Sequence, residues 1–366
     1  MNKNILIVAG GTGGHIYPAI ALAKILQKRG FSISFVIGQR DKCVNIIEKE
    51  NFNYYRLNVS GMPRKFSFKF VFFLFKLFVS ILTSFLLLKK TKPALVLGLG
   101  NYLSFPVLFS AKIAGIPTVI HEQNYLPGIA NKVLSKMAAK IMISFPESIK
   151  YFDESKTVFT GNIVRKEILE GLNTNTPESF NADAGKFKIL IFGGSLGAHA
   201  INQLMVDALG ALEKYKSKLQ FMHLAGEKDI IRVENSYKEK GFDAKVMTYL
   251  HNIGSAYAFS DLVVCRAGAT TVAELIALKK PAILIPFPYA TENHQKFNAD
   301  YLGNNHAAVV IEEKSLSPQK LSMLLSEFVE NPGKLLSYKK AFDNITAFKS
   351  LNPEIVMVDT IVNLIK

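Results

Sequence analysis

Cysteine is scarce in this chain of 366 residues. There are two cysteines, Cys43 and Cys265, and they stand far apart in the sequence. This spacing suggests no disulfide framework and indicates a reducing compartment. No charged leader with a cleavage site precedes the first apolar run, so we expect no signal peptide. The sequence also lacks the His and Cys clusters of zinc sites and the Gly-x-Ser-x-Gly motif of hydrolases.

Acidic residues are absent from the whole stretch between Asn51 and His121. Residues 1–165 hold 22 Lys and Arg against 7 Asp and Glu, whereas residues 166–366 hold 22 basic and 22 acidic residues. The entire formal charge of +15 therefore lies in the first half of the chain. A basic surface without acidic residues attracts phosphate groups, either of nucleic acid or of anionic lipid.

Motifs for metal and common cofactors are missing too. No Asp-x-Asp triplet occurs, and this triplet is the usual means of holding a divalent metal on the diphosphate of a sugar nucleotide. After Gly11-Thr12-Gly13, the third glycine of a dinucleotide fingerprint would fall at Ile16. Neither glycine turn has the Gly-Lys-Ser/Thr ending of an ATPase phosphate loop. We therefore expect no metal and no cofactor, and we find no motif for NAD or ATP.

What the chain does contain is a glycine turn that occurs twice. The apolar run 4–9 (NILIVA) leads into residues 10–15 (GGTGGH), and the run 187–192 (FKILIF) leads into residues 193–198 (GGSLGA). Each pattern predicts a buried strand, a turn and a helix. The turn leaves backbone N–H groups at the helix N-terminus, where phosphate or another anion binds. Two such units suggest two nucleotide-type folds facing a shared cleft.

Strand and helix patterns alternate along the chain, which predicts an α/β protein with parallel sheets covered by helices. The polar stretch 171–185 lacks periodicity and indicates a loop near the domain boundary. We expect one domain over residues 1–164, a second over 165–352, and a last helix over 353–366 that packs back onto the first domain. Strands are expected at residues 4–9, 32–37, 53–58, 94–99, 117–121, 139–143, 157–160, 186–192, 219–224, 244–248, 261–265, 281–285 and 307–311.

The most hydrophobic stretch, residues 66–88, could be a core or partner-binding helix, a membrane span, or a helix in the membrane surface. On a helical wheel at ~100° per residue, a polar set falls within an arc of roughly 120°, and Phe and Leu occupy the rest. This set consists of Lys65, Lys69, Lys76, Ser80, Thr83, Ser84 and Lys90. A narrow cationic stripe on a wide apolar body is typical of a helix that lies in the membrane surface.

A membrane span and a core or partner-binding helix fit this segment less well. One crossing would put strands of a single sheet on opposite sides of the bilayer, and two crossings need about 40 apolar residues, about twice the number present. The lysines disfavour a wholly internal helix, although part of the apolar face must pack on its own domain. Nucleic acid is disfavoured as a partner because the basic residues alternate with a continuous apolar surface and not with isolated stacking aromatics.

Polar residues follow several strands, where ligands bind in open α/β sheets. His15 can act as a base near neutral pH, or simply cap its helix. Arg165 can pair with a diphosphate, or be an ordinary surface arginine. Glu274 can accept two hydrogen bonds from a ribose diol, or be a carboxylate favoured by the helix dipole. The runs 121–124 (HEQN) and 293–295 (NHQ) look like cleft lining.

Seven separated motifs together resemble the MurG-type transferases of bacterial peptidoglycan synthesis, in order over nearly the whole chain. They are GGTGGHIYPAIALA, GLGNYLSFP, HEQNYLPGIANK, GNIVR, GGSLGA, CRAGATTVAE and HQKFNA. The resemblance implies the GT-B fold, with two Rossmann-like domains whose parallel sheets face a cleft. It also implies an inverting transfer of N-acetylglucosamine from UDP-GlcNAc to the C4 hydroxyl of the muramoyl sugar of lipid I (undecaprenyl-diphospho-N-acetylmuramoyl-pentapeptide), which gives lipid II and UDP.

The resemblance further implies that the second domain holds UDP-GlcNAc and the first holds the lipid-linked acceptor. His15 matches a histidine proposed as general base, Glu274 matches a ribose-binding glutamate, and Leu250 matches a position that holds uracil through its backbone. The positions that the resemblance assigns to UDP-GlcNAc are Thr12, Gly13, Gly14, Asn124, Arg165, Ser195, Leu250, Ala269, Thr270, Thr271, Val272, Ala273, Glu274 and Gln295.

A peripheral location on the cytoplasmic face of the inner membrane is implied as well, with UDP-GlcNAc, lipid I, anionic lipid and cell-wall synthesis proteins as partners. The residues expected to face the membrane are Lys65, Lys69, Phe72, Phe75, Lys76 and Phe78. Two other functions stay open from the sequence: a UDP-GlcNAc epimerase of the same fold, and a non-catalytic, membrane-bound nucleotide-binding subunit. The long acid-free apolar segment disfavours the epimerase, and the two glycine turns with a set of cleft residues in one chain disfavour the subunit.

Overall fold

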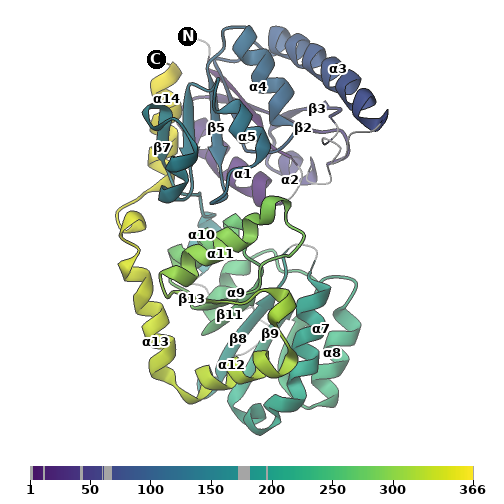
Figure 1. Ribbon diagram of the computed structural model, residues 1–366, viewed down its shortest axis with the longest axis vertical. Helices are drawn as coiled ribbons and strands as arrows, with labels where there is room; N and C mark the ends of the chain where they lie inside the picture. The colour runs from purple at the N-terminus through teal and green to yellow at the C-terminus, as the bar shows by residue number, and fades with distance from the viewer. Residues whose placement is uncertain are drawn as a thin grey trace. The chain divides into compact units, whose positions relative to one another are not determined.

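The chain forms two compact units, Met1–Ile163 with Ser350–Lys366, and Val164–Lys349. A computed structural model describes residues 3–10, 13–41, 44–59, 61, 68–171, 182–194 and 197–365. Within these residues, each unit contains one sheet with helices packed against it (Figure 1). We refer to them as the first and the second unit.

The sheet of the first unit has, within the described residues, seven strands in the order β3-β2-β1-β4-β5-β6-β7. Every neighbouring pair is parallel. The strands are β1 (Asn4–Val8), β2 (Ser32–Gly38), β3 (Asn53–Leu57), β4 (Leu95–Gly98), β5 (Thr118–Glu122), β6 (Lys140–Ile143) and β7 (Thr157–Phe159). The strand order reverses between β1 and β4, and in such sheets ligands bind beyond the carboxyl ends of the strands at this point.

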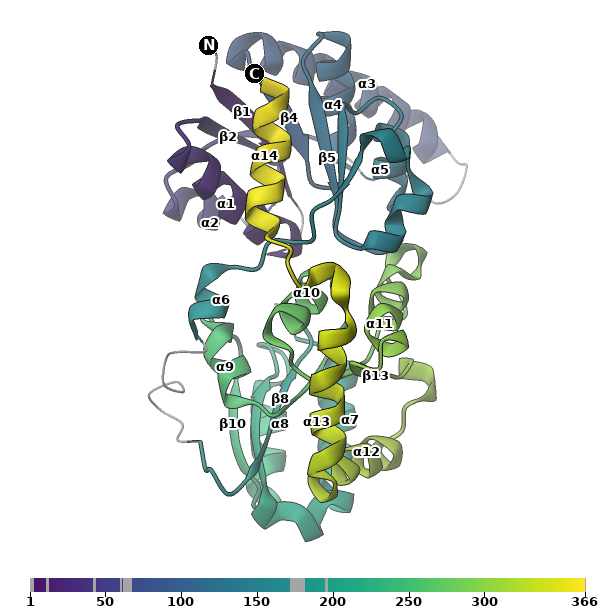
Figure 2. The same cartoon turned by 90° about the vertical axis from the view of Figure 1, so that its left-hand side faces the viewer.

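Alternate residues of β1 point to opposite faces of the sheet, and each face has its own core. Ile5 and Ile7 belong to the cluster that contains residues of α1 (Gly13–Lys28) and α14 (Pro353–Ile365). Leu6 and Val8 belong to the cluster with α4 (Ser104–Ile113). The last helix thus completes the first unit, and Figure 2 shows α14 beside α1. The other helices described in this unit are α2 (Val44–Lys49), α3 (Phe68–Thr91), α5 (Ile129–Leu134), η1 (Pro146–Tyr151) and η2 (Glu154–Lys156).

The second unit repeats this plan with six parallel strands among its described residues, in the order β10-β9-β8-β11-β12-β13. The strands are β8 (Phe187–Phe192), β9 (Leu219–Leu224), β10 (Asp243–Met247), β11 (Leu262–Cys265), β12 (Ala282–Leu284) and β13 (Ala308–Val310). The helices are α6 (Lys166–Glu170), α7 (His199–Ala208), η4 (Leu209–Lys218), α8 (Ile230–Glu239), α9 (Ile253–Phe259), α10 (Ala269–Leu278), η5 (Thr291–Asn293), α11 (His294–Asn304), η6 (Glu313–Ser315), α12 (Pro318–Glu330), α13 (Pro332–Ala341), η7 (Phe342–Asn344) and η8 (Thr346–Phe348).

The α/β class with two parallel sheets is confirmed, and each strand expected from the sequence is present with ends that differ by at most one residue. The reason is local. Strands buried on both faces of a parallel sheet read as continuous runs of β-branched and other apolar residues, bounded by glycine or polar turns.

The orientation of α3 corrects one interpretation of the sequence. Ser80 and Ser84, which the helical wheel placed in the polar stripe with the lysines, are 2% and 0% exposed and face the unit. The Ser84 hydroxyl donates to the carbonyl of Ser80 (2.7 Å), and the one hydroxyl hydrogen of Ser80 is shared between the carbonyls of Lys76 (2.7 Å) and Asn58 (2.9 Å). A serine that bonds to its own helix needs no water, so it can lie at a helix contact.

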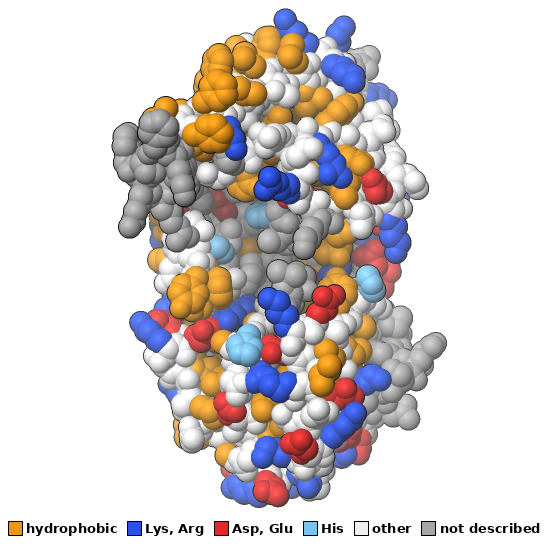
Figure 3. Space-filling model, turned by 90° about the vertical axis from the view of Figure 1, so that its right-hand side faces the viewer, with side chains coloured by type: hydrophobic (Ala, Val, Ile, Leu, Met, Phe, Trp, Pro, Cys, Tyr) orange, Lys and Arg blue, Asp and Glu red, His pale blue; other side chains and the backbone are white. Residues whose placement is uncertain are grey.

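The helix α3 packs against α4, where the hydroxyl of Ser110 donates to the carbonyl of Ile81 (3.0 Å). The outward face of α3 is consequently apolar. Its exposed hydrophobic residues are Val71, Phe72, Leu74, Phe75, Phe78, Val79, Leu82 and Leu86. Hydrophobic side chains gather on the upper part of the surface in Figure 3. Among the described residues, Phe70–Thr91 is the segment long and apolar enough to cross a membrane, and 17% of its most apolar window is buried.

Candidate functional site

The first glycine turn leads directly into α1, whose first three residues are Gly13, Gly14 and His15. His15 is half-buried in the first turn of this helix, at the carboxyl end of β1. Thr12 lies outside the described residues, as do Ser195 and Lys65, so the structure places none of these three predicted contacts.

The run after β5 is more buried than the sequence suggested. His121, Glu122 and Gln123 are 1%, 2% and 3% exposed, so they do not form the open polar lining that we expected. Asn124 is half-buried and is the member of the run with the most accessible side chain.

Glu122 organises that loop through its buried carboxylate. Oε1 accepts hydrogen bonds from the backbone N–H of Asn124 (2.9 Å) and from its side-chain amide (3.4 Å). Oε2 accepts from the N–H of Gly128 (3.1 Å) and the amide of Asn131 (2.8 Å). Burial raises the pKa of Glu122, and these donors oppose the shift. The carboxylate therefore fixes Asn124, one of the residues that we expect to bind UDP-GlcNAc, at the end of β5.

His121 stands next to this carboxylate and close to His15. Its Nε2 donates to the carbonyl of Gly161 (3.2 Å) and lies 3.0 Å from the hydroxyl of Ser144. Burial lowers the pKa of His121 to about 4, the bond to Gly161 opposes this, and the nearby His15 lowers it slightly further. His121 is therefore a neutral, buried support at neutral pH.

In the second unit, a buried carboxylate lies beside a guanidinium. Oε1 of Glu274 on α10 is 4.0 Å from a terminal nitrogen of Arg165, and the two side chains are 12% and 21% exposed. Oε2 of Glu274 accepts a hydrogen bond from the hydroxyl of Tyr257 on α9 (2.8 Å). Burial raises the pKa of Glu274, while Arg165 and Tyr257 both oppose the rise. Two residues chosen from the sequence thus meet, and Tyr257 joins them.

Close helix packing brings Arg165 to this place. Arg165 directly precedes α6, and α6 packs against α9. At Gly254, a Cβ atom would lie 2.6 Å from the carbonyl oxygen of Glu167, so only glycine permits this approach without a shift of the backbone.

The other residues of the second unit that we expect to bind UDP-GlcNAc lie after its strands. Leu250 is half-buried after β10, and Ala269, Thr270, Thr271 and Ala273 are half-buried in the first turns of α10. Val272 is fully buried in the core, so its side chain is not available to a ligand. Gln295 is the second residue of α11, and its Oε1 accepts the N–H of Phe287 (3.0 Å).

Arg266 is a residue that our sequence interpretation did not single out for a role. It is 8% exposed and donates to the carbonyls of Ile285 (3.1 Å) and Pro286 (3.2 Å). Its guanidinium also pairs with Glu313 and lies over the ring of Phe287, 5.3 Å from the centroid. Arg266 therefore supports the segment that presents Gln295. An arginine between a buried strand and a glycine turn is a signal for such a role, because a buried guanidinium needs several acceptors.

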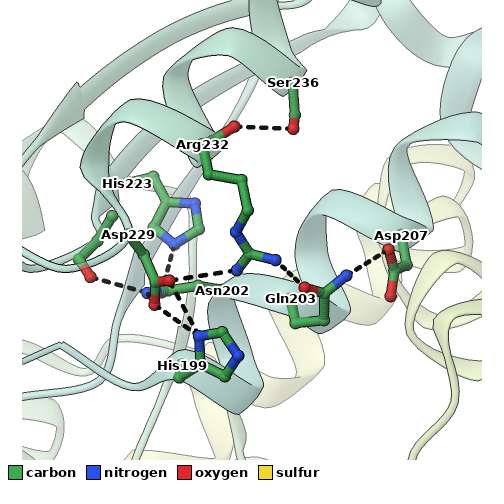
Figure 4. A network of polar contacts seen from close by, with 9 residues as sticks. His199, Asn202, Gln203, Asp207, His223, Asp229, Arg232 and Ser236 are labelled. Carbon is green, nitrogen blue, oxygen red and sulfur yellow. Dashed lines mark hydrogen bonds and ion pairs between the residues drawn. The ribbon is translucent and has the colours of Figure 1, made fainter.

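A polar network joins α7 to β9 and to Asp229, the residue before α8 (Figure 4). The side-chain amide of Asn202 on α7 donates to the carbonyl of Ala225 (2.7 Å) and to Oδ2 of Asp229 (2.8 Å). His199, the first residue of α7, contacts Oδ1 of Asp229 (2.9 Å). Because both N–H groups of Asn202 are used, its Oδ1 accepts the Nε2–H of His223 (3.0 Å). Burial lowers the pKa of His223 to about 3, so this histidine is neutral.

A close backbone contact reinforces that network. Gly197 has φ +76°, and a Cβ atom there would lie 2.4 Å from the carbonyl oxygen of Ala225. Gly197 is thereby held against the end of β9. No group of three or more His, Cys, Asp or Glu side chains arranged to hold a metal ion occurs among the residues that the structure describes.

Comparison with known proteins identifies the family. The N-terminal domain of glycosyltransferase family 28 matches residues 5–143, and the C-terminal domain of this family matches residues 188–355. A UDP-N-acetylglucosamine–N-acetylmuramyl-(pentapeptide) pyrophosphoryl-undecaprenol N-acetylglucosamine transferase of Myxococcus xanthus is 41% identical, over 92% of this chain and 87% of that protein. The protein of the same name from Citrifermentans bemidjiense is 38% identical, over 98% and 99%.

A solved structure agrees with these relatives. The crystal structure of Acinetobacter baumannii MurG superposes with a TM-score of 0.79 and 27% identity, over 99% of both chains. These findings favour the transferase over the epimerase and over the non-catalytic subunit. The chain belongs to glycosyltransferase family 28 and, within it, to the MurG-type N-acetylglucosamine transferases.

Proposed function

We propose that this chain transfers N-acetylglucosamine from UDP-GlcNAc to the C4 hydroxyl of the muramoyl sugar of lipid I, releasing UDP and forming lipid II. The observation that carries the proposal is the largely buried carboxylate of Glu274 on α10, which lies 4.0 Å from Arg165. A carboxylate accepts hydrogen bonds from both hydroxyls of a ribose, and a guanidinium pairs with a diphosphate. The two groups therefore match adjacent parts of one uridine diphosphate.

The resemblance to the MurG-type transferases implies a single displacement at C1 of the donor sugar. The acceptor oxygen forms a bond to C1 of the donor sugar while the bond from C1 to the diphosphate oxygen breaks, which inverts the configuration at C1. The diphosphate leaves as an anion, and Arg165 with the N–H groups at the start of α10 stabilises its charge. The proton of the acceptor hydroxyl passes to His15, or to water beside it.

Binding of the donor tests the proposal. Glu274→Ala is expected to weaken UDP-GlcNAc binding at least tenfold, because a hydrogen bond to a charged group contributes about 1.5–3 kcal/mol and each 1.4 kcal/mol is tenfold. Calorimetry with the purified chain measures the affinity, and Glu239→Ala, at the exposed last residue of α8, is the matched control. Unchanged affinity in a folded Glu274→Ala protein would remove this residue from the donor site.

Turnover is tested with radiolabelled UDP-GlcNAc and a lipid I analogue, by label in the lipid product. The purified chain alone is expected to transfer the label, and to do so in EDTA. Activity lost in EDTA and restored by magnesium would overturn the metal-free mechanism. Release of N-acetylmannosamine instead of lipid labelling would indicate epimerase activity.

The outward face of α3 supports a peripheral location on the cytoplasmic face of the inner membrane. Phe72, Phe75 and Phe78 are 58%, 63% and 60% exposed, and Nζ of Lys76 lies 4.6 Å from the ring centroid of Phe72. Apolar residues that enter the lipid surface with a cation beside them are typical of interfacial helices. The side chains of Lys65 and Lys69 lie outside the described residues. Cell-wall synthesis proteins at the same membrane are the proposed protein partners.

Vesicle sedimentation tests the membrane surface. A triple variant with Phe72→Ser, Phe75→Ser and Phe78→Ser is expected to lower the fraction bound to anionic vesicles at least tenfold, since burying one such ring contributes about 1.5–3 kcal/mol. Transfer to a water-soluble acceptor analogue should be unchanged in this variant. Equal vesicle binding of both proteins would show that α3 is not the membrane contact.

A further inference from the structure

We propose that Tyr257 is a positioning residue that holds Glu274 for recognition of the ribose hydroxyls, so that it sets the preference for ribonucleotides over deoxyribonucleotides. The inference rests on the proposed function, because it assumes that Glu274 meets the ribose. The observation is the hydrogen bond of 2.8 Å from the Tyr257 hydroxyl to Oε2 of Glu274.

The Tyr257 ring is a fixed support. Tyr257 is fully buried on α9, and its ring meets that of Phe192 on β8 edge to face, with centroids 6.0 Å apart. A buried tyrosine hydroxyl requires a hydrogen-bond partner, and here the partner is the carboxylate. Tyr257 has two rotatable side-chain bonds, so little motion is left at its hydroxyl once the ring is packed. The position of Oε2 is therefore set by a rigid part of the unit.

Tyr257 keeps its hydroxyl hydrogen and therefore always donates the hydrogen bond to Glu274. Burial and the charge of Glu274 raise the pKa of Tyr257 well above its usual value, and Arg165 opposes the rise. The Cys265 thiol on β11 is buried, and burial and Glu274 raise its pKa as well. Both groups are thus neutral in the working range. Arg165 and Tyr257 stabilise the carboxylate of Glu274 from two sides, against burial that favours its protonated form.

The arrangement leaves the carboxylate able to bind a ligand. Each carboxylate oxygen can accept two hydrogen bonds. Oε2 accepts one from Tyr257, so Oε2 and Oε1 together have capacity for two hydroxyls of a ribose. Without the Tyr257 hydroxyl the carboxylate can rotate about its terminal bond and protonates at a higher pH. Binding of a diol suffers from both changes, whereas binding of the uracil and the diphosphate does not depend on them.

The experiment compares UDP with 2′-deoxy-UDP by calorimetry, in the wild type and in Tyr257→Phe. We expect the variant to bind UDP about tenfold more weakly and 2′-deoxy-UDP almost as the wild type does, so that the ratio of the two affinities falls. The loss of UDP affinity at acid pH should begin at a higher pH in the variant, because Glu274 loses the hydrogen bond from Tyr257 that lowers its pKa. The control is Tyr237→Phe, a buried tyrosine whose hydroxyl lies 3.3 Å from Nδ1 of His223.

Tyr257→Met, which also lacks the donor and fills similar space, repeats the test if the phenylalanine variant does not fold. An equal loss for both nucleotides, or no loss for either, would overturn the inference and assign Tyr257 a structural role. Glu274→Ala tests the proposed donor site separately. If this change leaves UDP binding unchanged, the proposed donor site itself is wrong. If Tyr237→Phe lowers the ratio of the UDP and 2′-deoxy-UDP affinities as much as Tyr257→Phe does, the effect is not specific to Tyr257 and the inference is refuted.

Discussion

Glu122 uses its carboxylate for hydrogen bonds within the protein. Its carboxylate accepts hydrogen bonds from Asn124, Gly128 and Asn131, and 2% of the residue is exposed. A carboxylate is an acceptor at both oxygens, whereas a glutamine amide would turn one of them into a donor facing N–H groups. Replacing it therefore leaves buried donors without an acceptor, and this costs more than the bonds alone contribute.

Glu122→Gln is accordingly expected to lower the free energy of unfolding by about 1–3 kcal/mol. The exposed Glu147, on the 3-10 helix after β6, offers a matched change, Glu147→Gln, that should have almost no effect. Urea unfolding followed by circular dichroism measures both. Equal stability of Glu122→Gln and the wild type would contradict the role that we assign to the buried carboxylate.

His15 is expected to act on the rate and not on donor affinity. His15→Ala should lower kcat about 10²–10⁴-fold, the usual contribution of a general base, with a small change in KM for UDP-GlcNAc. His15→Asn keeps a hydrogen-bonding side chain without a base at neutral pH, and should lose a similar factor. A small effect that does not vary with pH would make His15 a binding residue.

At the scale of elements, the sequence predicts what is local and misses what depends on a neighbour. Buried strands and glycine turns are local patterns, so the strands were predicted to within one residue. The helical wheel gives the relative angles of residues on α3, but it cannot tell which side meets α4. Serines are ambiguous in such a pattern because their hydroxyls bond to their own helix, as Ser84 does to Ser80.

A pair of neighbouring residues tests the orientation of α3. Ser84→Leu should lower the free energy of unfolding by about 1–3 kcal/mol, because Ser84 is fully buried where α3 packs on its unit and a larger side chain overpacks it. Thr83→Leu, one residue earlier and exposed, should change the stability by less than about 0.5 kcal/mol. Thermal unfolding of the two proteins decides between the structure and the helical wheel, which places both residues in one polar arc.

Across the whole molecule, the sequence indicated two similar folds, but not which side chains meet within each. Arg165 and Glu274 were both candidates on chemical grounds, and their separation of 4.0 Å depends on the packing of α6 against α9. Tyr257 was missed because its partner is 17 positions away on another helix, with β11 in between. Hydrogen bonds between elements leave no periodic signal in a sequence, so they appear only once the topology is known.

Each sheet also contains one buried, neutral histidine, His121 on β5 and His223 on β9. Their pKa values are lowered to about 4 and about 3 by burial. In the unfolded chain a histidine has a pKa of about 6.5. Between these values the unfolded state binds a proton that the folded state does not, so stability is lost as pH falls through about 6.5.

For His223 alone, this difference lowers the free energy of unfolding by about 2 kcal/mol between pH 7 and pH 5. His223→Gln retains an N–H donor for Asn202 but does not titrate, so its stability should fall less over the same range. Urea unfolding at both pH values measures the two slopes. His121 still titrates in the His223→Gln protein, and it should account for a loss of similar size that remains. If the slope of His223→Gln equals that of the wild type, His223 does not contribute to the sensitivity of this chain to acid.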